Sequence, residues 1–170
     1  LRTLADPWDD LAMVGFLRSP AIGMSDRGIT QLRWSQSENE PIALRLALEK
    51  DGSYLSHEDQ QAVERAKTIF SEFGPLVGLI PVAALFQKLM NHSQYRVLMA
   101  ATIDRGWRNI DKLILDAYNS QQSSIHAYLE YVQRISDTGV REGEAAGAAE
   151  DAIQLMTIHK SKGLEFPWVV

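Results

Sequence analysis

Polar side chains of several chemical types gather near the end of the sequence, between two short apolar runs at 153–158 and 166–170. The polar and small residues of interest are Thr157, His159, Lys160, Lys162, Gly163 and Glu165. Short apolar runs bounded by glycine and polar residues suit buried parallel strands, and ligands usually bind at the tips between such strands. The pattern therefore indicates phosphate-compatible chemistry at one crossover, with a solvated lysine-rich surface turn as the alternative.

The string T-I-H-K-S-K-G-L-E-F-P in this segment resembles motif V of superfamily 1 DNA helicases of the UvrD/Rep/PcrA type, and most closely the branch containing AddA and RecB. The resemblance implies that Thr157 and His159 face single-stranded DNA. A hydroxyl and an imidazole fit that role, because both can hydrogen-bond phosphate and an imidazole can lie against a base. Lys160 and Lys162 follow closely, and their ammonium groups either attract phosphate or are simply solvated.

The same resemblance implies that Glu165 reaches the ATP ribose, because a carboxylate can accept hydrogen bonds from the ribose hydroxyls. Gly163 permits a backbone geometry or a close approach that other residues are denied. ATP and Mg²⁺ are thus expected in a longer parent protein, and none is expected on this chain, because it contains no G-x-x-x-x-G-K-[ST] phosphate loop. We expect no catalytic residue in the chain and no ATP hydrolysis by it.

The residues before 137 show helical hydrophobic periodicity and no convincing strand alternation. The predicted helical segments are 7–18, 41–48, 57–73, 81–89, 95–101, 107–118 and 125–135. Asp6 is the predicted N-cap of the first segment, and Ser56 and Asp59 form a capping box for the third. A serine at 123 or 124 caps the last segment. The sequence thus predicts a compact, mainly α-helical domain.

The beginning of the chain carries a second resemblance. Residues 6–26, D-P-W-D-D-L-A-M-V-G-F-L-R-S-P-A-I-G-M-S-D, resemble the start of the accessory domain in AddA-type helicases. The residues that carry the likeness are Asp10, Leu17, Arg18, Ser19 and Pro20. The resemblance implies that the helical part is the inserted accessory domain, 2B, of such an enzyme.

Residues 137–150 divide the chain, because glycine, alanine and acidic residues give this stretch little to bury and predict a flexible linker. The helical accessory domain is then 1–136. The resemblance assigns 151–170 to a short β-containing tail, the start of the second half of a truncated α/β RecA-like motor domain, 2A, with motif V. Leu1 is no natural start and Val170 lies inside a predicted strand, so we expect a piece of a longer protein.

Composition sets limits on function. The chain has 170 residues, 45% of them apolar and 23% charged, which is typical of a soluble globular protein. No apolar run is long enough to span a membrane, and the absence of cysteine excludes disulfides and thiolate metal sites, so we expect a cytoplasmic protein. A net charge of −5 is unusual for a stand-alone nucleic-acid binder, so any DNA contact needs local patches or neighbouring domains.

Other candidate groups are weaker. His126 and Glu130 are four residues apart, but a metal site needs more ligands, and none is expected. Trp107 stands between arginines and could stack on a base, although its place in an apolar stripe favours the core. Arg27-Gly28-Ile29 is a weak hint of a duplex-contact turn.

The sequence therefore favours one part of an ATP-dependent DNA helicase or translocase that acts in DNA repair or recombination. Its helical domain would orient duplex DNA or a partner such as a nuclease subunit, and its tail would couple ATP to single-stranded DNA. Two alternatives stay open: a protein-interaction module, and a scaffold whose parent has lost its ATPase activity.

Overall fold

The computed structural model describes residues 1–34, 40–95, 97, 106–122, 124–137 and 159. Every regular element in this part of the chain is helical: α1 (Arg2–Ala5), α2 (Asp10–Arg18), α3 (Asp26–Arg33), α4 (Leu44–Ala47), α5 (His57–Phe73), the 3-10 helix η1 (Gly74–Leu76), α6 (Val82–His92), α8 (Gly106–Asn119) and α9 (Ile125–Asp137). The prediction of a mainly α fold is confirmed. The predicted linker and β-containing tail lie outside the described residues, apart from Asp137 and His159.

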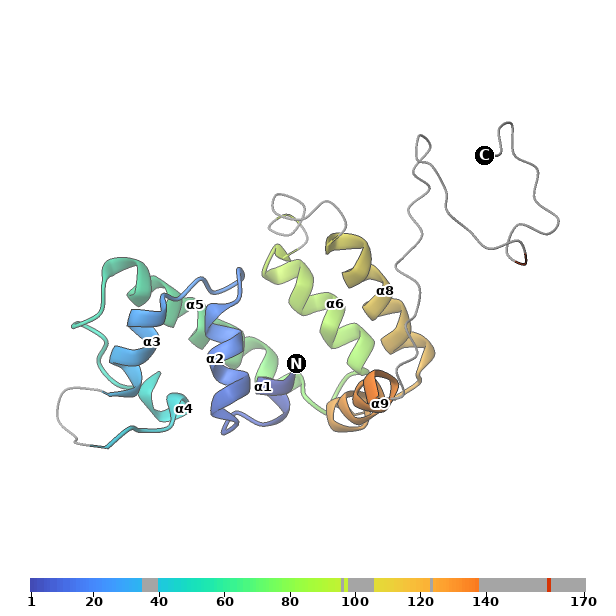
Figure 1. Cartoon of the computed structure of the whole chain (residues 1–170), viewed down its shortest axis with the longest axis horizontal. Helices are drawn as coiled ribbons and strands as arrows, with labels where there is room; N and C mark the ends of the chain where they lie inside the picture. The colour runs from blue at the N-terminus through green and yellow to red at the C-terminus, as the bar shows by residue number, and fades with distance from the viewer. Residues whose placement is uncertain (35–39, 96, 98–105, 123, 138–158, 160–170) are drawn as a thin grey trace.

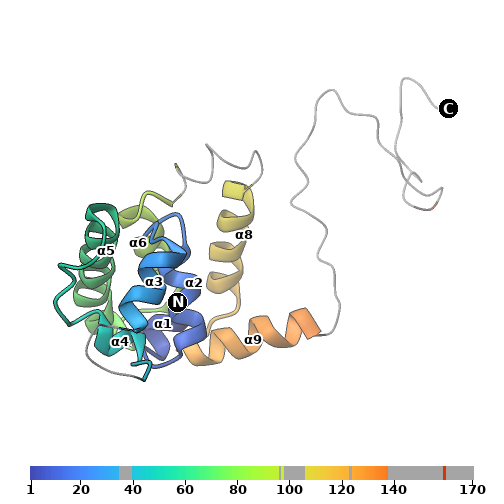
Figure 2. The same ribbon diagram turned by 60° about the vertical axis from the view of Figure 1, so that its left-hand side comes forward.

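The helices form two groups that lie side by side (Figure 1). Helices α1 to α5 make the first group, and α6, α8 and α9 make the second, with α6 packed along α8. Helix α1 packs against α9, so the start of the helical body lies beside its end, as Figure 2 also shows. None of the helices in the described ranges is long and apolar enough to cross a bilayer.

Helix α5 forms the longest element of the body, and its N-terminus is as predicted. The Ser56 Oγ accepts a hydrogen bond from the Asp59 backbone N–H at 3.2 Å, so Ser56 is the N-cap. The apolar face then recurs at helical spacing through Ala62, Ala66 and Ile69, all of which are buried. Burying a stripe of this kind against neighbouring helices supplies most of the stability of such a helix.

Helix α2 begins later than predicted. Its N-cap is Asp9, whose Oδ1 accepts from the Ala12 N–H at 3.0 Å. The predicted cap, Asp6, instead ends α1 and accepts from the Trp8 N–H at 2.9 Å, closing a turn between the two helices. The error has a physical cause: aspartate caps a helix and closes a turn by the same side-chain-to-backbone bond, so Asp6 and Asp9 compete for the same role.

Helix α3 was not predicted as a helix, and it contains the segment interpreted as a weak hint of a duplex-contact turn. Ser25 is its N-cap and accepts from the Gly28 N–H at 2.9 Å. Gly28 and Ile29 are buried in the helix, while Arg27 is exposed. The segment is thus the first turn of a capped helix, and its contact with duplex DNA stays a prediction.

The second group of helices follows the predicted apolar stripes, with one change. Val82 and Leu85 of α6 and Tyr128 of α9 are buried as expected. On α8, however, Leu113 and Tyr118 of the predicted stripe face solvent. The side chain of Trp107 and most of the predicted helix 95–101 lie outside the described residues.

Candidate functional site

The residues predicted to bind nucleotide and DNA fall almost wholly outside the described part of the chain. This applies to Thr157, Lys160, Lys162, Gly163 and Glu165. His159 is described, and its side chain is exposed. Their arrangement therefore stays a prediction, and the described geometry concerns the helical body.

The most buried charged group in the described part of that body is the carboxylate of Asp59, which is only 5% exposed. Its Oδ1 accepts from the Ser25 N–H at 2.8 Å, and its Oδ2 accepts from the Ser25 hydroxyl at 2.9 Å and the Ser56 hydroxyl at 2.8 Å. Both serines are helix N-caps, so one carboxylate joins the first turns of α3 and α5. Burial alone would raise the pKa of Asp59, but these hydrogen bonds outweigh it and hold the pKa below its usual value.

Gly28 lies against the face of this carboxylate. A Cβ atom at position 28 would stand 2.5 Å from the Asp59 Cγ, closer than two carbon atoms can approach. Glycine is therefore required for close packing of α3 on α5, rather than for an unusual backbone angle. Both oxygens of the Asp59 carboxylate already accept hydrogen bonds from the two N-cap residues, Ser25 and Ser56. The carboxylate therefore has a structural role and is not suited to proton transfer.

A second carboxylate, Asp10, joins three helices. Its Oδ2 accepts from the Arg33 guanidinium at 2.5 Å, and its Oδ1 accepts from the Leu44 N–H at 3.0 Å. The start of α2, the end of α3 and the start of α4 are thereby held together, as their positions in Figure 1 show. Unlike Asp59, this group is partly exposed.

A groove of about 630 Å³ runs along the outer face of α5 to the end of α6. The polar residues that line it include His57, Gln61, Arg65, Thr68, His92 and Gln94. Several of these groups already have partners within the chain. The Arg65 Nε donates to the Ile22 carbonyl at 3.1 Å, and His92 contacts Glu72 at 3.2 Å. Several of the polar side chains that line the groove therefore already bind other parts of the helical body, which leaves them less available for a ligand.

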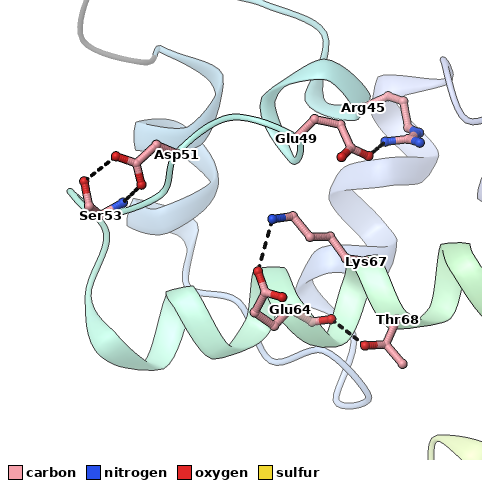
Figure 3. Close-up of polar contacts among 7 residues, drawn as sticks. All are labelled: Arg45, Glu49, Asp51, Ser53, Glu64, Lys67 and Thr68. Atoms are coloured by element: carbon pink, nitrogen blue, oxygen red, sulfur yellow. Dashed lines mark hydrogen bonds and ion pairs between the residues drawn. The ribbon is translucent and has the colours of Figure 1, made fainter.

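Charged pairs cover the adjoining surface between α4 and α5 (Figure 3). Arg45 pairs with Glu49, and Lys67 pairs with Glu64 at 3.1 Å. The Arg45 hydrogen bond and charge lower the pKa of the Glu49 carboxyl. Because the glutamate of each pair is exposed and the cation is about one third exposed, each pair contributes only about 0–1 kcal/mol to stability.

No group of three or more metal-binding side chains occurs among the described residues. His126 is exposed on α9, four residues before Glu130, which is also exposed. Nothing in the described ranges resembles a catalytic cluster of nucleophile and base.

Sequence reasoning missed the two carboxylate junctions, because each joins residues more than twenty positions apart. Asp59 was identified as one half of a local capping box, but its hydroxyl and N–H partner, Ser25, is 34 residues away. The signal for the missed helix was present: Ser25-Asp26 precedes an apolar pair, Ile29 and Leu32, at helical spacing.

Comparison with known proteins gives a consistent result. The family model described as "UvrD-like helicase C-terminal domain" matches residues 1–170. The chain is 27% identical over 180 residues to the exonuclease/helicase subunit RexA of Lactococcus lactis subsp. cremoris, covering 99% of this chain and 15% of that protein. It is 25% identical over 178 residues to an ATP-dependent helicase/nuclease subunit of Anoxybacillus flavithermus, and 26% identical over 180 residues to the corresponding subunit of Levilactobacillus brevis. Each of these two matches covers 99% of this chain and 14% of the relative, so the chain spans about one seventh of the length of its relatives.

Proposed function

Because the chain belongs to the family of UvrD-like helicase C-terminal domains, we propose that it works as one part of an ATP-dependent DNA helicase in DNA repair or recombination. The resemblance inferred from the sequence is confirmed at the level of the family. The observation that carries the proposal is the family match across all 170 residues, which includes the string T-I-H-K-S-K-G-L-E-F-P.

The proposed division of work follows the chain. The helical body, 1–136, orients duplex DNA or a partner subunit, and the tail, 151–170, belongs to the motor and couples ATP to the translocating strand. ATP and Mg²⁺ would bind to the longer parent protein, with Glu165 and Gly163 on the nucleotide side. Thr157, His159 and the two lysines would contact the single strand.

The geometry of the body supports its assignment as an inserted domain. Helices α1 and α9 pack against each other, so the two ends of the body lie together. A domain inserted into another needs this arrangement, because both connections must reach the same host.

The proposal is tested by substitutions in the parent protein. Glu165→Ala should weaken the use of ATP, while the pair Thr157→Ala and His159→Ala should lower DNA stimulation of ATP hydrolysis. Each lost hydrogen bond to a charged group is worth about 1.5–3 kcal/mol, or roughly 10- to 150-fold. Steady-state ATPase rates with and without single-stranded DNA separate the two effects.

Two results would contradict the proposal. Full DNA stimulation in the Thr157/His159 double variant would show that these residues do not contact the strand. Steady ATP turnover by the 170-residue chain alone would show that ATP hydrolysis does not need the rest of the parent protein. Glu130→Ala, on the exposed surface of α9, is a matched control that should leave both activities unchanged.

A second function, docking of a partner protein by the helical body, is favoured by the pairing of several of its arginines. Arg2, Arg18 and Arg33 each pair with a carboxylate of the body, at 2.7, 2.8 and 2.5 Å. A surface that binds phosphates needs cations that are not already neutralised. Salt-sensitive binding of duplex DNA by the isolated chain would support a DNA-orienting function of the helical body. Absence of such binding would support docking of a partner protein.

A scaffold whose parent has lost ATPase activity is distinguished by the parent's own sequence. An intact phosphate-binding loop upstream would support an active ATP-dependent motor. A loop that lacks its glycine and lysine residues would support an inactive scaffold.

A further inference from the structure

The groove along the outer face of α5 contains a guanidinium group whose charge the described residues do not neutralise. The Arg65 Nε donates to the Ile22 carbonyl at 3.1 Å, and a terminal nitrogen of Arg65 donates to the same oxygen at 2.5 Å. A carbonyl oxygen is neutral, and no carboxylate in the described part of the chain pairs with Arg65. Arg18, by contrast, is paired with Asp26 at 2.8 Å. Arg65 therefore presents a full positive charge in the groove.

The contact with Ile22 also holds the Arg65 side chain in position. The two hydrogen bonds use only part of the donors of a guanidinium group, so other N–H groups remain for a ligand. Ile22 itself is only 1% exposed, so its carbonyl is a fixed point of the fold. A charged group that is oriented before a ligand arrives loses less conformational entropy when the ligand binds.

Uncharged polar side chains extend the groove away from Arg65. His57 and Gln61 line it on the same face of α5, at a spacing of four residues each. From His57 to Arg65 the helix rises by about 12 Å, which is longer than the step between neighbouring phosphates of a DNA strand. Glu64 also lines the groove, but its carboxylate is paired with Lys67 at 3.1 Å. The groove thus suits a chain of phosphates better than one small anion.

Gln94 lines the other side of the groove, just after α6. It follows the C-cap residue Ser93 and has a φ of +49°, a left-handed conformation that favours glycine at the end of a helix. Glycine would leave no side chain in the groove, whereas the Gln94 amide lies there with no side-chain hydrogen bond to another described residue. Amide N–H groups are common donors to phosphate oxygens. A role in binding would explain a glutamine at this position.

We propose that this groove binds the phosphate backbone of duplex DNA, with Arg65 as its charged anchor and Gln94 as a further donor, an inference that rests on the proposed function. In the proposed enzyme the helical body meets duplex DNA, so the polyanion that reaches the groove is DNA. Phosphate contacts position a protein on DNA without reading its sequence. Binding at the groove should therefore be independent of sequence and sensitive to salt.

The site is tested by binding of a blunt DNA duplex to the parent protein, measured by fluorescence anisotropy at several salt concentrations. Arg65→Gln should weaken binding about tenfold and lower the slope of log affinity against log salt by about 0.9, the value for one phosphate contact. Arg65→Lys keeps the charge and should keep the slope. Arg134→Gln removes an exposed arginine of α9 outside the groove, changes the net charge equally, and should leave the slope unchanged.

Gln94→Gly tests the groove independently of Arg65. Glycine relieves the positive φ, so the melting temperature of the 170-residue chain should rise, while duplex binding by the parent should weaken about fivefold. Gln121→Gly makes the same backbone change at a φ of +53° outside the groove. It should raise the melting temperature and leave duplex binding unchanged.

An unchanged salt slope in Arg65→Gln would overturn the proposal, and so would an equal loss of slope in Arg134→Gln. A purely structural Arg65 would lower the melting temperature in both Arg65 variants without changing the slope. A change seen with a single strand and not with the duplex would also contradict the proposed ligand. DNA-stimulated ATP hydrolysis is measured on the same parent preparation. An unchanged slope in an active parent refutes only the groove, whereas a lowered slope in a parent without that activity refutes only the proposed function.

Discussion

The two helix groups share apolar packing and differ in the polar groups that they bury. In the first group, α1 to α5, buried or half-buried carboxylates join helices through directed hydrogen bonds, as Asp59 and Asp10 do. In the second group, α6, α8 and α9, apolar stripes pack together, and the most buried ionisable group among the described residues is the Tyr128 phenol. Buried apolar side chains form the core of both groups, and in the first group the Asp59 and Asp10 carboxylates add directed contacts between helices. Substitutions and pH should therefore act on the two groups separately.

The largest effect is expected from Asp59→Ala. It removes the acceptor of three hydrogen bonds and loosens the caps of two helices, so the free energy of unfolding should fall by about 3 kcal/mol. Urea titration followed by circular dichroism measures the loss. Glu58→Ala, at the exposed neighbouring position, is the control and should cost about 0.5 kcal/mol or less.

Gly28→Ala should also destabilise the wild-type chain, because the new Cβ would meet the Asp59 carboxylate at 2.5 Å. In the Asp59→Ala background the obstacle is gone, and the same substitution should stabilise α3 by about 0.5–1 kcal/mol through helix propensity. A double-mutant cycle on the two positions measures this change of sign. Additive effects would show that the carboxylate is not what Gly28 accommodates.

Acid and alkali should loosen different helix groups. The pKa of Asp59 is lowered in the folded chain, so its stabilisation is complete above the unfolded value of 3.8 and is lost as pH falls through the lower folded pKa. Burial, and then the charge of Asp116, raise the pKa of Tyr128 to about 12, so its contribution is complete below pH 10 and is lost as pH rises through 12. Hydrogen exchange should therefore increase first in α3 below pH 4, and first in α8 and α9 above pH 10.

Absorbance at 295 nm gives an independent test of the alkaline half. Tyr128 should ionise late, near pH 12, and Tyr128→Phe should abolish that late step. The substitution also removes the hydrogen bond from the phenol to the Leu113 carbonyl, 3.2 Å long, at a cost of about 1 kcal/mol. If α3 lost its protection from hydrogen exchange before α9 did in alkali, the predicted difference between the two helix groups would be wrong.

The smallest effect is expected at Gln121, which follows α8 with a φ of +53°. This left-handed conformation is favoured by glycine, so Gln121→Gly should stabilise the chain by about 0.5–1 kcal/mol. Gln122→Gly, next in the chain, lacks the positive φ and should not stabilise. A thermal melt comparing the two variants measures the difference, and equal melting temperatures would contradict the expected strain.

The parts of the fold that the sequence predicted are those encoded locally. The Ser56 cap, the stop at Ser19-Pro20 and the apolar face of α6 depend on residues a few positions apart, and all three are confirmed. The Asp6 prediction was wrong because a turn and a cap use the same bond. Helix α3 was missed since its short apolar pattern is weak without its distant partner, Asp59.

The candidate site residues were identified by the same kind of local signal. Thr157, His159 and Glu165 belong to a string of neighbouring residues, which requires no knowledge of the fold. The exposure of Trp8 and Trp34, which are 60% and 51% exposed, could not be found that way. Exposure of an apolar residue depends on what packs against it, which sequence periodicity does not contain.

The internal pairing of Arg2, Arg18, Arg33 and Arg45 has a consequence for how the chain responds to ionic strength. A guanidinium group that is already paired with a carboxylate of the same chain neutralises little phosphate charge. It therefore releases few counterions when DNA binds. These four arginines should therefore add little to the slope of log affinity against log salt of any DNA complex that contains the chain. Added salt should also screen the exposed pairs that these arginines form, and should thereby lower the stability of the body slightly.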